Sequence, residues 1–255
     1  MRNGKGSGRL MAFRIVAVIG AVLHAAPIVF LGASYTAGEM RIHVVHNAAG
    51  LAMFTAVIAL GWILAAISPD RMVAPFQAAT LAVVAVVVAS VISADVQGGL
   101  LSGVVGLVLV VLHPDRPVLA RIGRTGPLPL ILAALAVVPA IGFALESASL
   151  QRNGMPMDPH VEMHHWTGMA AFAMTLVVVA VVAGLGGPNR RIVAMVGGLS
   201  AMFFGVMALV YAGYPGAPAR AWAIACIAWG MLLAGDGYRM AREPGNEPIV
   251  MEGPA

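Results

Sequence analysis

Apolar runs of about 20 residues, nearly free of charge, recur along the whole chain and constrain its fold more than any other feature. A helix of roughly 20 residues, rising 1.5 Å per residue, spans the hydrocarbon core of a bilayer. Of the 255 residues, 60% are hydrophobic and only 10% are charged. A soluble domain has about 25% charged residues. The sequence therefore predicts an all-α polytopic membrane protein whose main partner is the lipid bilayer.

Eight such runs predict eight transmembrane helices. They cover residues 14–33, 45–67, 73–93, 97–114, 127–146, 164–186, 192–212 and 218–237. The first run follows Arg9 and Arg14, as the apolar part of a signal peptide would. It is long for such a segment, however, and no clear small-x-small cleavage motif follows it, so we interpret it as a span.

The basic residues predict the orientation. If the N-terminus is cytoplasmic, twelve Lys and Arg residues fall inside and three fall outside, namely Arg41, Arg152 and Arg220. These residues stand singly or in pairs at the ends of apolar runs, as membrane anchors do, which argues against a nucleic-acid partner. The segment from Pro159 to Leu185 resembles a group of uncharacterised polytopic membrane proteins of high-GC bacteria, and one lysine against fourteen arginines, with abundant Ala, Gly and Val, fits such a source. We expect a bacterial plasma-membrane protein with both termini in the cytoplasm.

The chain also contains an internal repeat. The segment from His46 to Phe54 aligns with residues 164–172 at an offset of 118; Pro27 aligns with Pro139 at 112, and Arg116 with Arg239 at 123. Because four helices are repeated, the two halves should run parallel and be related by an axis along the membrane normal. The predicted organisation is a tail (1–13), a first repeat (14–116), a linker (117–126), a second repeat (127–238) and a second tail (239–255).

Histidines gather at the predicted outer ends of the second and sixth helices. Five of the seven lie there: His43, His46, His160, His164 and His165. Methionines, among them Met163, precede the sixth helix, and Glu39 and Met40 precede the second. Imidazole together with soft sulfur suits copper. The pattern predicts an outward-facing metal or haem site, with His46, His164 and His165 as candidate cofactor ligands. The alternative is that these histidines only anchor helix ends at the headgroup level.

His24 lies deep in the first span, where an ionisable side chain is costly. Pro27, about one turn further on, lacks an N–H and so frees a backbone carbonyl next to His24. Two hypotheses follow: an intramembrane polar site, serving as a pathway or further ligand, or a neutral imidazole hydrogen-bonded between helices. Cys226 is the only cysteine, which excludes an internal disulfide and a cysteine-built metal site.

The segment His165-Trp-Thr-Gly168-Met169 resembles the signature of MHYT-type membrane sensor modules, whose histidine and methionine are proposed to bind copper. The resemblance implies His165 and Met169 as ligands, although His164 replaces the leading methionine of that family. The four-plus-four layout is similar to that of haem A synthase. That resemblance implies His46 and either His164 or His165 as axial ligands of haem b, with Glu162 as the acid. The fourth and eighth helices lack the further histidines of that family, which argues against the synthase activity.

Three functions remain open on the sequence: a copper- or haem-binding protein in redox chemistry, sensing or metal handling; a small-solute transporter; and a non-catalytic subunit or assembly partner of a membrane complex. The chain has no Walker A motif, nucleophile elbow or HExxH motif. Hydrolytic and nucleotide-driven functions therefore lose support, and we assign no catalytic residue.

Overall fold

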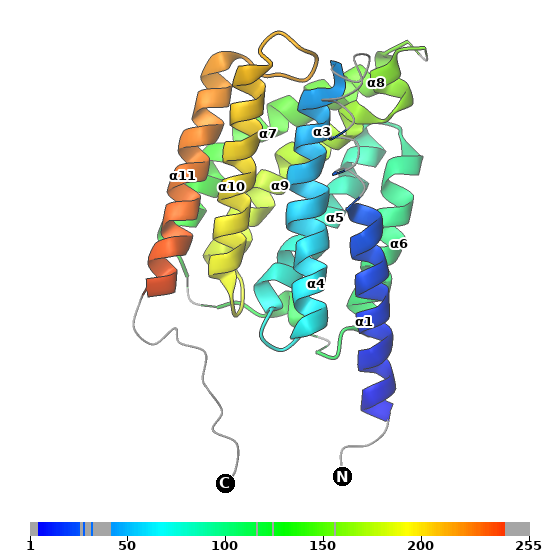
Figure 1. Ribbon diagram of the computed structural model, residues 1–255, viewed down its shortest axis with the longest axis vertical. Helices are drawn as coiled ribbons and strands as arrows, with labels where there is room; N and C mark the ends of the chain where they lie inside the picture. The colour runs from blue at the N-terminus through cyan, green and yellow to red at the C-terminus, as the bar shows by residue number, and fades with distance from the viewer. Residues whose placement is uncertain are drawn as a thin grey trace.

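The computed structural model describes residues 5–25, 28, 32, 42–115, 117–123, 125–155 and 157–242. Within these residues the chain is helical and contains no strand, so the all-α prediction is confirmed. The longer elements are α1 (Lys5–His24), α3 (Val44–Gly50), η2 (Leu51–Ala59), α4 (Leu60–Ile67), α5 (Val73–Ile92), α6 (Val96–Leu112), α7 (Pro127–Asn153), α9 (His165–Leu185), α10 (Arg190–Val210) and α11 (Arg220–Arg242). Two short elements, η3 (Val118–Ala120) and α8 (Pro159–Glu162), connect them. Figure 1 shows the long helices side by side in one bundle.

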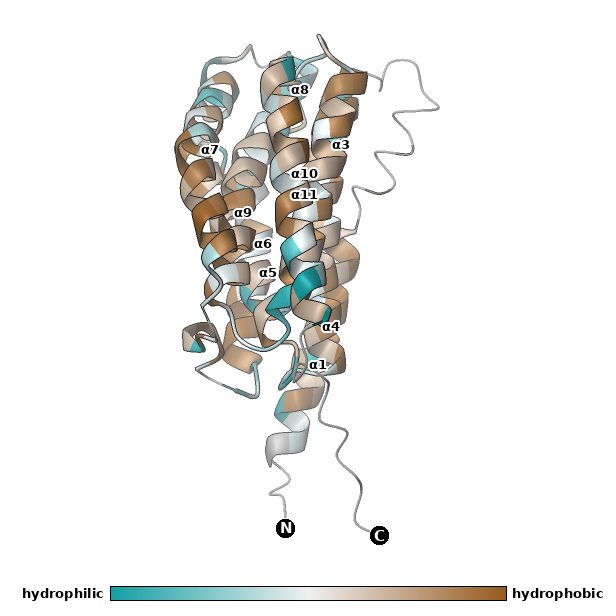
Figure 2. Cartoon of the chain, turned by 90° about the vertical axis from the view of Figure 1, so that its left-hand side faces the viewer, coloured by the Kyte–Doolittle hydropathy of each residue, from teal (hydrophilic) through white to brown (hydrophobic). Residues whose placement is uncertain are grey.

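Seven helices in the described part of the chain are long and apolar enough to cross a membrane. They correspond to seven of the predicted spans; α6, at 17 residues, is shorter, so the eighth crossing stays a prediction. Large apolar side chains point outward from the bundle, for example Val91 and Val138, which are 73% and 78% exposed. Hydrophobic residues run along the bundle, and hydrophilic ones gather toward its ends (Figure 2). Such a surface fits a lipid bilayer.

The second predicted span, residues 45–67, is one continuous helical rod with an unexpected centre. It begins as α3, continues for nine residues as the π-helix η2 and ends as α4. A π-helix is rare and often marks a functional region. The sequence analysis did not predict it, and nothing in the apolar pattern of Leu51–Ala59 distinguishes it from an ordinary helix.

Helix contacts within the second half match those within the first. In the first half, α1 and α5 each pack against α4 and α6; in the second, α7 and α10 each pack against α9 and α11. Between the halves, α5 packs against α9, and α10 packs against α3 and η2. Two four-helix repeats related by a twofold axis would give this pattern, although the repeat itself stays a prediction.

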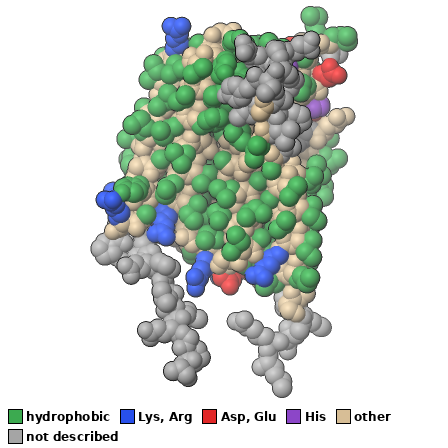
Figure 3. Space-filling view, in the orientation of Figure 1, with side chains coloured by type: hydrophobic (Ala, Val, Ile, Leu, Met, Phe, Trp, Pro, Cys, Tyr) green, Lys and Arg blue, Asp and Glu red, His purple; other side chains and the backbone are tan. Residues whose placement is uncertain are grey.

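Arginine side chains cap the helices at the end of the bundle where α1 begins. Arg9 donates to the carbonyls of Val111 and His113, at 2.7 and 2.6 Å, and Arg14 donates to that of Ala66 at 2.9 Å. These carbonyls belong to the C-terminal ends of α6 and α4, where cations are favourable. Figure 3 shows most of the Lys and Arg side chains of the visible face at this end.

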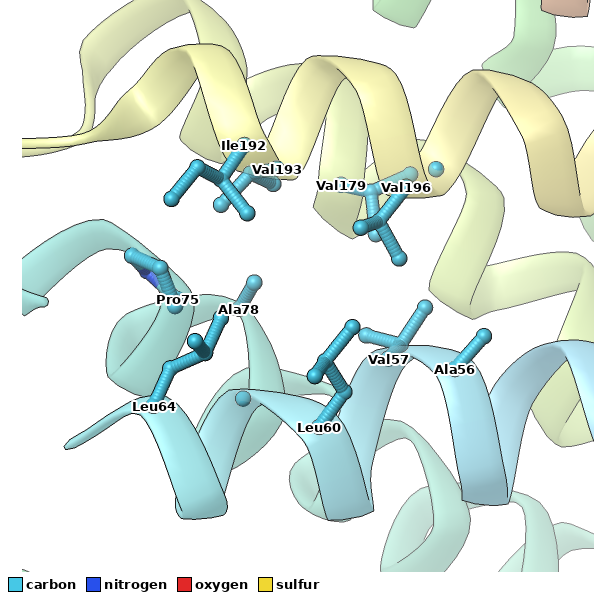
Figure 4. Close-up of a pocket in the computed structure, with 12 residues that line it drawn as sticks. Ala56, Val57, Leu60, Leu64, Pro75, Ala78, Val179, Ile192, Val193 and Val196 are labelled. Carbon is cyan, nitrogen blue, oxygen red and sulfur yellow. The ribbon is translucent and has the colours of Figure 1, made fainter. Parts of the chain in front are cut away.

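A small cavity between η2, α4, α5, α9 and α10 is a packing gap. It measures about 20 Å³ and is lined by apolar residues such as Leu60, Leu64 and Val196 (Figure 4). Such a space has room for about one water molecule. No polar side chain lines it, so it carries no site.

Glycines set the close approach of α10 and α11, which gives a first prediction. A Cβ on Gly230 would collide with the carbonyl oxygen of Gly198, whereas a Cβ on Gly235, in the same helix, would meet nothing within 4 Å. We expect Gly230→Ala to destabilise the fold by about 1–3 kcal/mol through overpacking. The matched Gly235→Ala should be neutral or slightly stabilising. Unfolding titrations of both variants in mixed micelles test this, and equal midpoints would contradict the α10–α11 packing.

Candidate functional site

Four of the five predicted histidines meet at the end of the bundle opposite Lys5. They are His43, just before α3; His46, in α3; His160, in α8; and His165, the first residue of α9. The ring centroid of His43 lies 4.5 Å from that of His160 and 4.6 Å from that of His165. The ring centroid of His46 lies 4.9 Å from that of His160 and 5.0 Å from that of His165. We refer to these four residues as the histidine cluster. It sits where α3, α8 and α9 come together at the top of Figure 1.

Local structure explains how α8 and α9 place their histidines. The Asp158 carboxylate caps α8 by accepting from the backbone N–H of His160 at 2.9 Å, and it also lies 3.0 Å from the Nδ1 of that residue. His164, between α8 and α9, has a left-handed backbone with φ of 57°. This single conformation reverses the chain so that His165 faces the histidine cluster and His164 faces Asp95.

The rings in the cluster contact one another more than they contact the backbone. The Nδ1 atoms of His43 and His165 lie 2.9 Å apart, a hydrogen bond when one of them is protonated. His46 stacks on His165 with an interplanar angle of 18°, and Trp166 packs edge-on against His46 at 4.7 Å. Both ring nitrogens of His46 are buried without a hydrogen-bond partner among the described residues. An unsatisfied buried polar atom costs about 1–3 kcal/mol, so a partner for His46 from outside the described residues would stabilise this site.

The surroundings of His43 and Asp158 lower the pKa of both side chains. Burial lowers the pKa of His43, the proximity of His160 lowers it further, and Asp158 opposes both effects. The pKa of Asp158 is lowered, chiefly because its carboxylate accepts the backbone N–H of His160. Neutral imidazole is the form that binds a metal ion, because its free nitrogen keeps a lone pair.

Three of the predicted ligands lie apart from the cluster. His164 is 39% exposed, and its Nδ1 lies 2.9 Å from the Asp95 carboxylate, which also accepts from the Thr167 hydroxyl. Met163 is 38% exposed, and Met169 is fully buried in the bundle core one turn beyond His165. Of the pair His164 and His165, the structure therefore brings only His165 next to His46.

Of the two hypotheses for His24, its contacts match an imidazole hydrogen-bonded between helices. Its Nδ1 lies 2.8 Å from the carbonyl of Gly20 and its Nε2 lies 3.0 Å from the Ser102 hydroxyl, so it bridges α1 and α6. Thr55 donates to the His24 carbonyl at 3.3 Å. The residues invoked with these histidines in the sequence, Pro27, Glu39 and Met40, lie outside the described residues.

The cluster contains imidazole groups that could bind a metal ion, but their orientations do not match the geometry of a bound ion. As the side chains stand, no three His, Cys, Asp or Glu groups in the described part of the chain converge as a bound ion requires. The imidazoles stack and tilt against one another, so their nitrogens do not point at one centre. A haem fits less well, since His46 and His165 lie face to face at 5.0 Å with no space between them for a porphyrin.

Trp166, Asp95 and Gly216 were missed by the sequence analysis as parts of this region. Gly216, in the loop between α10 and α11, lies directly against the His46 ring. Only the position of Trp166, next to His165, signalled its role. The other two come from distant parts of the chain.

No protein-family profile matches the chain, and no curated protein or solved structure matches it either. The resemblances to MHYT modules and to haem A synthase therefore stay expectations. Function has to be argued from the geometry.

The contact between Gly216 and His46 gives a second prediction. Gly213 and Gly216 both have positive φ, at 92° and 81°, so alanine is strained at either position. A Cβ on Gly216 would also lie 2.7 Å from the His46 ring, whereas one on Gly213 would meet nothing within 4 Å. We expect Gly216→Ala to cost about 1–3 kcal/mol more than Gly213→Ala. Unfolding midpoints of the two variants measure this difference, and its absence would remove Gly216 from the site.

Proposed function

We propose that this multi-pass membrane protein binds a copper ion at the histidine cluster. The observation that carries the proposal is the meeting of His43, His46, His160 and His165 with ring-centroid distances of 4.5–5.9 Å. Four imidazoles gathered at one place are costly unless something binds them, because both ring nitrogens of His46 are buried without a hydrogen-bond partner among the described residues.

The spacing of two nitrogens supports an ion between them. The Nδ1 atoms of His43 and His165 are 2.9 Å apart. Two imidazole nitrogens, each about 2.0–2.1 Å from one ion, lie roughly 3 Å apart. Rotation of the unpartnered His46 ring about its own side-chain bonds would add a third nitrogen, and His160 stands beside it. Among divalent first-row ions, copper has the highest affinity for such a nitrogen site.

Copper is supported better than the other candidates from the sequence. The stacked rings of His46 and His165 leave too little space between them for haem b. The hydrogen bonds of His24 to Gly20 and Ser102 support a structural role, which weakens one of the two observations behind a solute transporter, the other being the predicted repeat. A subunit or assembly role is compatible with copper binding but rests on no specific contact.

The orientation belongs to the same proposal. Arginines such as Arg9 and Arg14 lie at the end where α1 begins, and the positive-inside rule places that end in the cytoplasm of a bacterium. The histidine cluster then faces outward, with both termini inside. Copper would reach the cluster from the extracytoplasmic side, as expected for metal handling, sensing or redox chemistry at that face.

The third prediction tests copper binding itself. We expect the purified full-length protein to bind one copper ion per chain in competition with a chromophoric chelator, because the cluster is a single site. Replacing His46 and His165 together by asparagine should weaken binding at least 100-fold, since each lost ligand costs about tenfold or more.

Two matched controls make this test specific. His164→Asn removes the adjacent imidazole that faces Asp95, and His24→Asn removes a buried histidine elsewhere; both should keep copper affinity within about threefold. Failure of the wild-type protein to bind copper, or equal loss in the His164 variant, would overturn the proposal.

A further inference from the structure

The second half of the bundle contains a cavity. A cavity of about 780 Å³ lies between α7, α9, α10 and α11, below the loop that carries Gly216. This volume falls within the usual range of small-molecule sites, about 300–1,000 Å³. The cavity lies beside the histidine cluster, because Trp166 and Gly216 both line it and also contact His46.

The matching space in the first half is filled by His24. Its ring packs against Trp62 at 5.0 Å and Phe54 at 5.7 Å, and its hydrogen bond to Ser102 joins α1 to α6. Side chains from α1, from the rod formed by η2 and α4, and from α6 thereby meet in its interior.

The predicted repeat relates this cavity to the filled space of the first half. With the offsets of 112, 118 and 123 found in the sequence, His24, Phe54 and Ser102 correspond to Ala136, Phe172 and Ala225. All three of the latter line the cavity. The aromatic ring is kept, but the imidazole and the hydroxyl that fill the first half are both replaced by alanine, so the opening lies where two side chains are missing.

The walls of the cavity define the chemistry of a ligand. Six aromatic side chains line it: Phe143, Trp166, Phe172, Phe204, Trp222 and Trp229. The Trp229 indole already donates to the carbonyl of Leu132 at 2.9 Å. Polar side chains stand only toward the Gly216 end, where Glu146 and the buried Ser147 come from α7. An apolar body with one polar head fits this arrangement.

The cavity is also accessible from the side of the bundle. Leu135 and Trp222 line it and are 67% and 55% exposed. Both belong to helices long and apolar enough to span a membrane, so the approach is from lipid. A ligand dissolved in the bilayer can enter without crossing water.

We propose that this cavity binds a membrane quinone or quinol. A flat ring suits a space between indole and phenyl side chains, and an isoprenoid tail can extend past Leu135 into lipid. The Glu146 carboxylate can accept a hydrogen bond from a quinol hydroxyl. A phospholipid fits less well, because the described lining has no basic side chain for a phosphate, and haem fits less well, because that lining has no histidine. This proposal does not depend on copper binding.

Tryptophan fluorescence gives a direct test on the full-length protein in nanodiscs. Three of the four tryptophans line the cavity, whereas Trp62 is buried in the first half. Decylubiquinone should therefore quench the emission saturably and incompletely. Ala136→Phe, which restores a ring inside the cavity, should raise the dissociation constant at least tenfold. The matched control Val138→Phe, on the lipid face of the same helix, should leave it unchanged.

Further measurements keep the outcome decisive. Circular dichroism and the copper affinity should be retained in Ala136→Phe, so that a folding defect is recognised; if that variant unfolds, Ala225→Leu takes its place. Glu146→Gln should weaken the reduced quinol more than the oxidised quinone, because only the quinol donates a hydrogen bond to the carboxylate. Quenching that is linear in decylubiquinone, or identical in Ala136→Phe, would mean partition into lipid only and overturn the proposal.

Discussion

The contact between the start of α3 and the start of α9 places imidazoles against imidazoles in a buried site, and the local structure around them follows from that constraint. The rings of His43, His46 and His165 are too crowded to be hydrated individually. Asp158 holds His160 beside them, and the left-handed His164 aims His165 inward. Within the part of the chain that the structure describes, the ring nitrogens of His46 have no hydrogen-bond partner, and a bound ion would offset that cost.

The two halves of the bundle show how one scaffold can carry different interiors. In the first half, His24 and Ser102 close the space with a hydrogen bond between α1 and α6. In the second, a cavity with aromatic walls lies between α7, α9, α10 and α11. Trp166 packs against His46 on one side and lines the cavity on the other, so occupancy of either site changes the surroundings of the same indole. Trp166 and Gly216, which also lines the cavity and lies against His46, are the physical link between the proposed metal and quinone sites.

Sequence reasoning reached the helical architecture because apolar length depends only on local composition. It also found the end of the bundle at which His43, His46, His160 and His165 meet, since their positions at helix starts follow from the spans. It could not choose between His164 and His165, because one left-handed residue decides which ring turns inward. The π-helix and the cavity could not be predicted from the sequence, because each depends on how distant apolar side chains pack. The pattern of apolar residues in the sequence does not distinguish one packing from another.

X-ray absorption at the copper edge of the copper-loaded protein tests the central claim most directly. A first shell made only of nitrogen or oxygen, with the outer scattering of imidazole rings, is expected, because no sulfur of the described methionines is seen to join the histidine cluster. That outer scattering should diminish when His46 and His165 are replaced by asparagine. A sulfur scatterer in the first shell, or a spectrum unchanged by these substitutions, would place the ion elsewhere and contradict the account.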